Sequence, residues 1–214
     1  MLSKRFYTNL IIGIFIAIVL GIMAYFYVPK IFGDIIYPLK YEEYIIKYSK
    51  EYAMDPTLVA AIIYSESHFD ASVISRAGAE GLMQIMPSTA KGIAQRIGAN
   101  SDFNLFDPET NIRFGTSYIR SLIDAYNGDI NSALAAYNGG SGTADRYVIS
   151  RSYNDIPEET ANYIEKVNSA HQMYSNLYSR ILSAQDVKEL LFIKQEEQQK
   201  SWYEKLLERL GWKK

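Results

Sequence analysis

The sequence contains no cysteine, and this absence excludes several classes of chemistry. Disulfide frameworks, thiolate metal sites, cysteine nucleophiles and a lipid-modified N-terminal cysteine all require that residue. Histidine is almost as scarce, since His68 and His171 are the only two and neither belongs to an HExxH motif or a ligand cluster. We therefore expect neither a metal ion nor a cofactor.

An excess of charge of either sign is also missing. The 214 residues include 22 Lys and Arg against 24 Asp and Glu, which gives a formal net charge of -2. Without a basic surplus there is no electrostatic reason to expect nucleic acid as a partner. The length allows one globular domain of about 130 to 150 residues with appendages.

The N-terminal part contains one long run without charge. The 20 residues of "NLIIGIFIAIVLGIMAYFYV", Asn9 to Val28, follow Lys4 and Arg5. At about 1.5 Å per residue, this run matches the hydrocarbon thickness of a bilayer. A removed signal peptide and a buried core helix are the alternatives. The length and the aromatic end "YFY" favour an uncleaved anchor over the first, and the lack of a polar face disfavours the second.

Positive-inside logic gives this anchor an orientation. Residues 1–8 are expected to form a cytoplasmic tail, residues 9–28 the transmembrane anchor and residues 29–40 a short stalk. Everything after Val28 is then extracytoplasmic, and the protein is a single-pass protein of the cell membrane.

Helix signals dominate residues 41–182, which we expect to form one mainly α domain. Asp55-Pro56 and Asp107-Pro108 each combine an N-cap side chain with a proline at the first helical position. No stretch alternates apolar and polar residues as a half-buried strand does. The predicted helices cover approximately residues 41–54, 56–67, 88–97, 108–127 and 130–138, followed by a long helix after Pro157.

Residues 183–214 are charged and rich in glutamine, yet Trp202, Leu206 and Leu210 recur every four residues. This spacing predicts one amphipathic helix. Two interpretations stay open: a helix packed on the domain or simply solvated, or a helix that binds the membrane surface or a protein of the cell-wall or envelope machinery.

Glu66, in "IIYSESHF", is the most unusual polar residue of the sequence. On the helix predicted from Pro56, the residues three, four, seven and eight positions before it are all aliphatic. Desolvation and the partial negative charge of a helix C-terminus should both raise the pKa of Glu66. A carboxylic acid protonated near neutral pH suits general acid catalysis, although a buried glutamate bonded to nearby backbone would show the same pattern.

A loop that suits a sugar ligand follows, "SRAGAEGLMQIMPSTA", residues 75–90. Its glycines permit close approach to the backbone, Gln84 offers a donor and an acceptor, and Met86 offers soft apolar surface. Individually these residues are weak evidence, because a methionine-rich loop more often belongs to a core.

The order of five short motifs along the chain is more specific evidence than any of these single residues. "ES" at 66–67 is followed by "SRAGAEGLMQIMPSTA", "FDPETNIRFGTSYI", "ALAAYNGG" and "EETANYIEKV". This order resembles the soluble lytic transglycosylase (SLT) catalytic domain, a goose-type lysozyme-like domain of glycoside hydrolase family 23. The resemblance covers residues 44–174 and implies a lysozyme-like fold; "FDAS" departs from the asparagine-proline that many relatives have after "ES".

The resemblance also implies roles for individual residues. Glu66 would be the single catalytic acid and base, and Tyr137 would contact the substrate at the reacting centre. Asn138 would hold the adjacent loop, and Glu159 would be an outer acid, although a helix N-terminus favours an acid at that position anyway. The remaining substrate-binding residues implied are Ser75, Gln84, Met86 and Tyr163.

The implied substrate is peptidoglycan, cut at the β-1,4 bond between N-acetylmuramic acid and N-acetylglucosamine. One carboxyl group would protonate the glycosidic oxygen and then deprotonate the muramyl C6 hydroxyl, which gives a 1,6-anhydromuramyl end. The alternatives are a muramidase of the same fold that admits water, and an inactive glycan-binding module that acts as a scaffold in a cell-wall assembly.

Overall fold

The computed structural model describes residues 4–184 and 187–211, and within these ranges the chain is helical, with only isolated bridges at Ile74, Glu80 and Ile85. The predicted mainly α class is confirmed. The chain divides into two units, of which one contains residues 37–195 and the other contains residues 1–36 and 196–214. The larger unit extends beyond the predicted catalytic domain at both ends.

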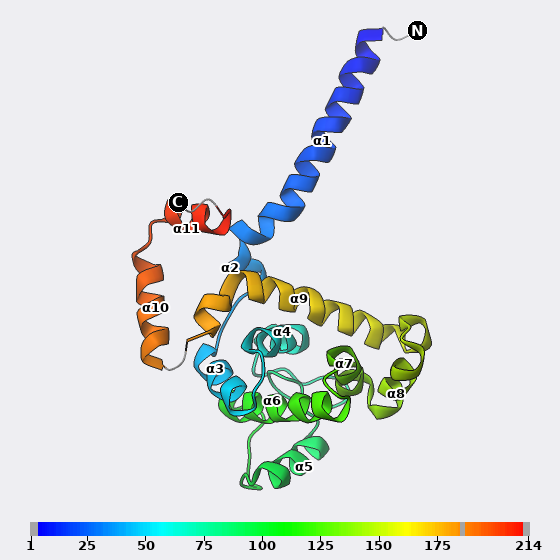
Figure 1. Cartoon of the computed structure of the whole chain (residues 1–214), viewed down its shortest axis with the longest axis vertical. Helices are drawn as coiled ribbons and strands as arrows, with labels where there is room; N and C mark the ends of the chain where they lie inside the picture. Colours follow the sequence, from blue (N-terminus) through cyan, green and yellow to red (C-terminus); the bar gives the residue numbers. More distant parts are fainter. Residues whose placement is uncertain (1–3, 185–186, 212–214) are drawn as a thin grey trace. The chain divides into compact units, whose positions relative to one another are not determined.

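The larger unit surrounds one central helix (Figure 1). This helix, α4, packs against α3 and most extensively against α9. Nine of its twelve residues are buried, and each large aliphatic side chain among them contributes about 1.5–3 kcal/mol. The helices are α3 (Glu42–Glu51), α4 (Pro56–Ser67), α5 (Pro87–Ile97), α6 (Pro108–Ala125), α7 (Ile130–Gly139), α8 (Ser141–Ser150), the 3-10 helix η1 (Tyr153–Asp155), α9 (Glu158–Leu182) and the first part of α10 (Val187–Gln199), which continues past residue 195 into the other unit.

Local capping explains where the main helices begin. Asp55 Oδ1 accepts hydrogen bonds from the Thr57 backbone N–H at 2.8 Å and from the Thr57 hydroxyl at 2.7 Å. Asp107 caps α6 in the same manner, accepting from the Thr110 N–H at 2.9 Å. Because these contacts involve neighbours in sequence, the predicted starts of both helices are confirmed.

Helix α8 was not predicted. Gly139 and Gly140 end α7, but the chain resumes a helix at once with Ser141. A Cβ on Gly139 would lie 2.8 Å from Thr160 Oγ1 and 2.9 Å from Thr143 Cγ2, so this glycine permits close packing of α7 on its neighbours. The glycine pair marks a tight junction between two helices and not the beginning of a loop.

The chain before α3 is attached to the larger unit. The Tyr174 hydroxyl donates to the Pro38 carbonyl at 2.6 Å, and the Tyr178 hydroxyl donates to the Tyr37 carbonyl at 2.7 Å. Both tyrosines lie on the buried side of α9. The last residues of the expected stalk therefore pack on the domain.

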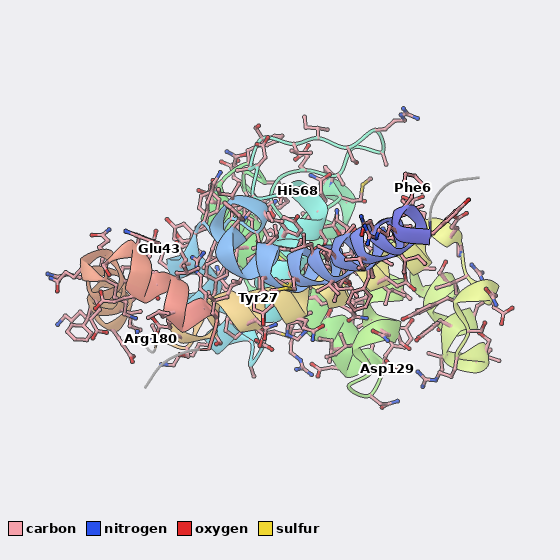
Figure 2. The ribbon with its side chains drawn as sticks, turned by 90° about the horizontal axis from the view of Figure 1, so that it is seen from above. Phe6, Tyr27, Glu43, His68, Asp129 and Arg180 are labelled. Atoms are coloured by element: carbon pink, nitrogen blue, oxygen red, sulfur yellow. The ribbon has the colours of Figure 1, made fainter. Side chains whose placement is uncertain are left out.

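The smaller unit contains a long apolar helix, α1 (Lys4–Ile31), and two short ones, α2 (Gly33–Ile36) and α11 (Trp202–Arg209). Residues 5–25 of α1 form a segment long and apolar enough to cross a membrane, and the described side chains among them are exposed. Phe6 and Tyr27 are labelled near the two ends of α1 in Figure 2. The predicted single helix in the tail is wrong. Ser201 caps α11 through a reciprocal capping box with Glu204, which separates α11 from α10.

Candidate active site

Glu66 lies in the last turn of α4, one residue before the helix ends. Its side chain is half-buried, and the resulting desolvation raises the pKa of the carboxyl to about 7. Tyr163 and Lys166 act in the opposite direction and lower the pKa, but by less than burial raises it. Near neutral pH the carboxyl is therefore present in both its protonated and its ionised form, as a group that must donate and later accept a proton requires.

Two tyrosines from distant parts of the sequence lie near this carboxyl. Tyr137 comes from α7 and Tyr163 from α9, and burial raises the pKa of each hydroxyl well above its ordinary value, with Glu66 adding to the shift. Tyr163 is 8% exposed, and its hydroxyl lacks a hydrogen bond of good geometry among the described residues. The predicted residues Glu66, Tyr137 and Tyr163 are thus close together in the fold.

The chain after Glu66 turns sharply. His68 has φ 51 and Phe69 has φ 65, so two consecutive residues other than glycine adopt the left-handed region. Phe69 is 1% exposed and its ring contacts Tyr174, so the turn is stabilised by packing on the core.

Asp70 follows this turn. Its carboxylate accepts hydrogen bonds from the Ser72 N–H at 2.9 Å and the Ser72 hydroxyl at 2.6 Å, which lowers the pKa of Asp70. Asp70 is thus an ionised turn residue and not a second catalytic acid.

The sugar-binding loop predicted at residues 75–90 is folded by its own polar groups. Ser75 Oγ accepts from the Ala79 N–H at 2.9 Å and closes a turn. Gln84 Nε2 donates to the Val73 carbonyl at 3.1 Å and to the Gly81 carbonyl at 2.8 Å. Both side chains therefore shape the loop, whereas Met86, at its end, remains 38% exposed.

Three side chains outside the loop hold it beside Glu66. Asn111, fully buried on α6, accepts from the Met83 N–H at 2.7 Å and donates to the Glu80 and Leu105 carbonyls at 2.9 and 2.7 Å. The Ser67 hydroxyl donates to the Leu82 carbonyl at 2.8 Å. The Tyr137 hydroxyl donates to the Met83 carbonyl at 2.7 Å, so this tyrosine joins the loop to the acid.

Sequence reasoning missed two of the residues that define this site. Asn111 could have been suspected as a polar residue in an otherwise apolar helix face, but its two partners in the loop, Glu80 and Met83, are distant in sequence. Lys166 gave no signal on a helix with many charges. Its Nζ donates to the Ser65 carbonyl at 2.6 Å, which places a positive charge next to the last turn of α4.

Asn138 and Glu159 lie at the junction between α7 and α9. Asn138 Oδ1 accepts from the Thr160 hydroxyl at 2.9 Å and so connects the two helices. Glu159 is exposed in the first turn of α9, and Glu66 is not among its described contacts. The prediction that Glu159 acts behind the site stays a prediction.

A second carboxylate is not among the described groups that shift the pKa of Glu66. The described residues also contain no cluster of three or more metal-binding side chains. A cavity of about 530 Å³ lies at the opposite end of α4, between that helix, α3 and α9, and none of the predicted site residues lines it. The arrangement around Glu66 therefore offers one acid with an elevated pKa and two tyrosines near it.

Comparison with known proteins gives this arrangement a family. The model of the transglycosylase SLT domain matches residues 43–160, more than half of the chain. The chain belongs to the transglycosylase SLT family. This family assignment confirms the resemblance found in the sequence.

Curated relatives of the family align with part of the chain. A transglycosylase of Enterobacteria phage PRD1 is 39% identical over 54% of this chain and 40% of its own length. Membrane-bound lytic murein transglycosylase C of Edwardsiella ictaluri is 33% identical over 64% of this chain and 47% of its own. The chain thus spans less than half the length of these relatives.

Solved structures of the family share the fold. Lytic transglycosylase Slt from Pseudomonas aeruginosa, in an inactive mutant form, is 28% identical, with a TM-score of 0.63 over 72% of this chain and 29% of that protein. The 70 kDa soluble lytic transglycosylase of Escherichia coli is 30% identical, with a TM-score of 0.59 over 65% of this chain and 24% of that one. The lysozyme-like SLT fold is therefore confirmed.

Proposed function

We propose that this protein is a membrane-anchored lytic transglycosylase that cleaves peptidoglycan strands outside the cell. The observation that carries the proposal is the single acid Glu66, whose pKa is raised to about 7 at the end of an apolar helix. Tyr137 and Tyr163 lie near this acid, and relatives in the family are lytic murein transglycosylases by name.

The reaction divides into two proton transfers through the same carboxyl group. Protonated Glu66 donates its proton to the oxygen of the β-1,4 bond between N-acetylmuramic acid and N-acetylglucosamine, and the bond from C1 of the muramyl residue to that oxygen breaks. The carbonyl oxygen of the substrate's own N-acetyl group stabilises the positive charge that develops at C1.

The carboxylate of Glu66 then removes the proton from the C6 hydroxyl of the same muramyl residue, and O6 bonds to C1. Glu66 ends protonated, as it began, and the product carries a 1,6-anhydromuramyl end without consuming water. A retaining glycosidase needs a second carboxylate as its nucleophile, and no described carboxylate shifts the pKa of Glu66.

Digestion of purified peptidoglycan tests this activity. Full-length protein in detergent is incubated with peptidoglycan beside Glu66→Gln, and the new ends are examined by mass spectrometry. Anhydro ends that are lost in the variant support the proposal. Reducing ends, heavier by one water, would instead show a muramidase, and binding without cleavage would show a scaffold module.

The proposed topology follows from Lys4 and Arg5 before the span, which positive-inside logic places in the cytoplasm. Because the chain contains no cysteine, single cysteines can report which side each segment occupies. In intact cells, a membrane-impermeant maleimide should label Lys91→Cys on α5, whereas Ser3→Cys should react only after permeabilisation. The reverse labelling would overturn the orientation.

A further inference from the structure

Large apolar side chains remain exposed in the smaller unit outside the predicted span. Phe32 is 48% exposed, Ile35 on α2 is 77% exposed and Trp202 on α11 is 76% exposed. Residues of this size are unfavourable in water when they gather in one unit, since burial of each contributes about 1.5–3 kcal/mol. The pattern indicates that this unit meets an apolar phase beyond α1.

Helix α11 separates its apolar and charged residues onto two sides. Trp202, Leu206 and Leu210 follow one another at four-residue spacing, while Glu204, Lys205, Glu208 and Arg209 occupy the rest of the circumference. An eight-residue helix is marginal in water by itself, even with its capping box. Leu206 and Leu210 are half-buried within this unit, whereas Trp202 remains exposed and needs a further surface against which it is buried.

The position of α11 in the fold indicates which surface this is. It belongs to the same unit as α1 and contacts that helix (Figure 1). A helix that packs on a membrane-spanning helix and carries charges of its own must lie where the bilayer meets water. α11 is thus placed at the membrane interface by its contact with α1.

The charges of α11 fit an anionic membrane surface. Lys205 and Arg209 lie three and seven residues after Trp202, so they border its side of the helix. Their long side chains can extend to lipid headgroups while the aromatic ring enters the boundary of the acyl chains. Five of the seven charged residues between Lys200 and Lys214 are basic.

We propose that α11 is an interfacial helix that binds anionic phospholipid headgroups, with Trp202 inserted into the membrane boundary. This inference rests on the membrane anchoring that we proposed above and not on the proposed enzymatic activity. Residues 36 and 196 connect the smaller unit to the two ends of the larger one. The larger unit is then connected to membrane-bound segments at both of its ends.

Tryptophan fluorescence tests the proposal, because Trp202 and Trp212 are the only tryptophans. Full-length Trp212→Phe is reconstituted into vesicles of phosphatidylcholine and phosphatidylglycerol, with bromine placed at shallow or deep positions of the acyl chains. We expect the Trp202 emission to lie at shorter wavelength than that of a tryptophan exposed to water. We also expect bromine at shallow positions of the acyl chains to quench it more than bromine at deep positions.

Two charge reversals of equal size complete the test. Lys205→Glu should reduce the quenching at least twofold in vesicles with phosphatidylglycerol, whereas Lys91→Glu, an exposed position on α5, should leave it unchanged. Trp202 emission typical of water, quenched by aqueous iodide and not by brominated lipid, would overturn the proposal. If alkali extracts the whole protein from the vesicles, the anchor itself fails and the interfacial helix with it; peptidoglycan cleavage is measured separately on the same sample.

Discussion

The strongest prediction concerns the stability of Glu66→Gln. The pKa of Glu66 is raised from 4.5 to about 7 in the folded protein, so between these pH values the folded state binds more protons than the unfolded state. The contribution of the protonated Glu66 carboxyl to the free energy of unfolding is therefore fully present below about pH 4.5 and is lost as the pH rises through about 7. The glutamine variant cannot ionise and avoids this loss.

The size of the effect follows from the two pKa values. At about 1.36 kcal/mol per pH unit, the interval from 4.5 to about 7 corresponds to about 3 kcal/mol in the free energy of unfolding. We thus expect Glu66→Gln to gain stability relative to wild type as the pH rises from 5 to 8. For a chain of this size the gain corresponds to about 6–12 °C in the unfolding temperature.

Thermal unfolding of both full-length proteins in the same detergent, at pH 5 and pH 8, measures this difference. Glu158→Gln provides the matched control, because Glu158 is exposed in the first turn of α9 and should show no such gain. Equal pH dependence in wild type and Glu66→Gln would refute the reasoning, since it would mean that the carboxyl is not desolvated in the folded protein.

Three further changes probe the surroundings of the acid. Lys166→Met removes a positive charge that lowers the pKa of Glu66. The pH at which kcat/KM declines on the alkaline side should therefore rise, by at most about 0.7 pH unit because the charge is exposed, and a fall in that pH would contradict this. Asn111→Ala removes three buried hydrogen bonds and should destabilise by about 2–4 kcal/mol in denaturant unfolding, and a loss below 1 kcal/mol would be inconsistent with them. Gly115→Ala places a Cβ against the side chain of Met83, 2.8 Å from its Cβ, and should cost about 1–3 kcal/mol, measured in the same manner; an unchanged free energy of unfolding would contradict this close packing.

Local signals explain the parts of the fold that the sequence predicted well. Asp55 and Pro56 start α4, and an aliphatic face leads to Glu66, so the helix that carries the acid depends on contacts within a few residues. The apolar run of α1 is equally local. The capping box of Ser201 and Glu204 is local too, and it divides the tail into two helices where the four-residue spacing predicts one.

The loop near Glu66 shows where local reasoning stops. Substrate binding by Ser75 and Gln84 stays a prediction, and their described hydrogen bonds show that both side chains also fold the loop itself. Asn111 was not expected to matter, yet it holds the loop from α6. Hydrogen bonds between residues distant in sequence depend on the packing of whole helices, which no window of sequence contains.

The sequence by itself determined the acid, the helix that carries it and the family motifs around it, because capping, periodicity and spacing are short-range properties. Only the tertiary structure decided what surrounds Glu66. It brought Tyr137, Tyr163 and Lys166 to one carboxyl from two other helices, and the balance of burial and charge that they create sets its pKa near 7. A pKa depends on every group packed nearby, whichever part of the chain supplies it.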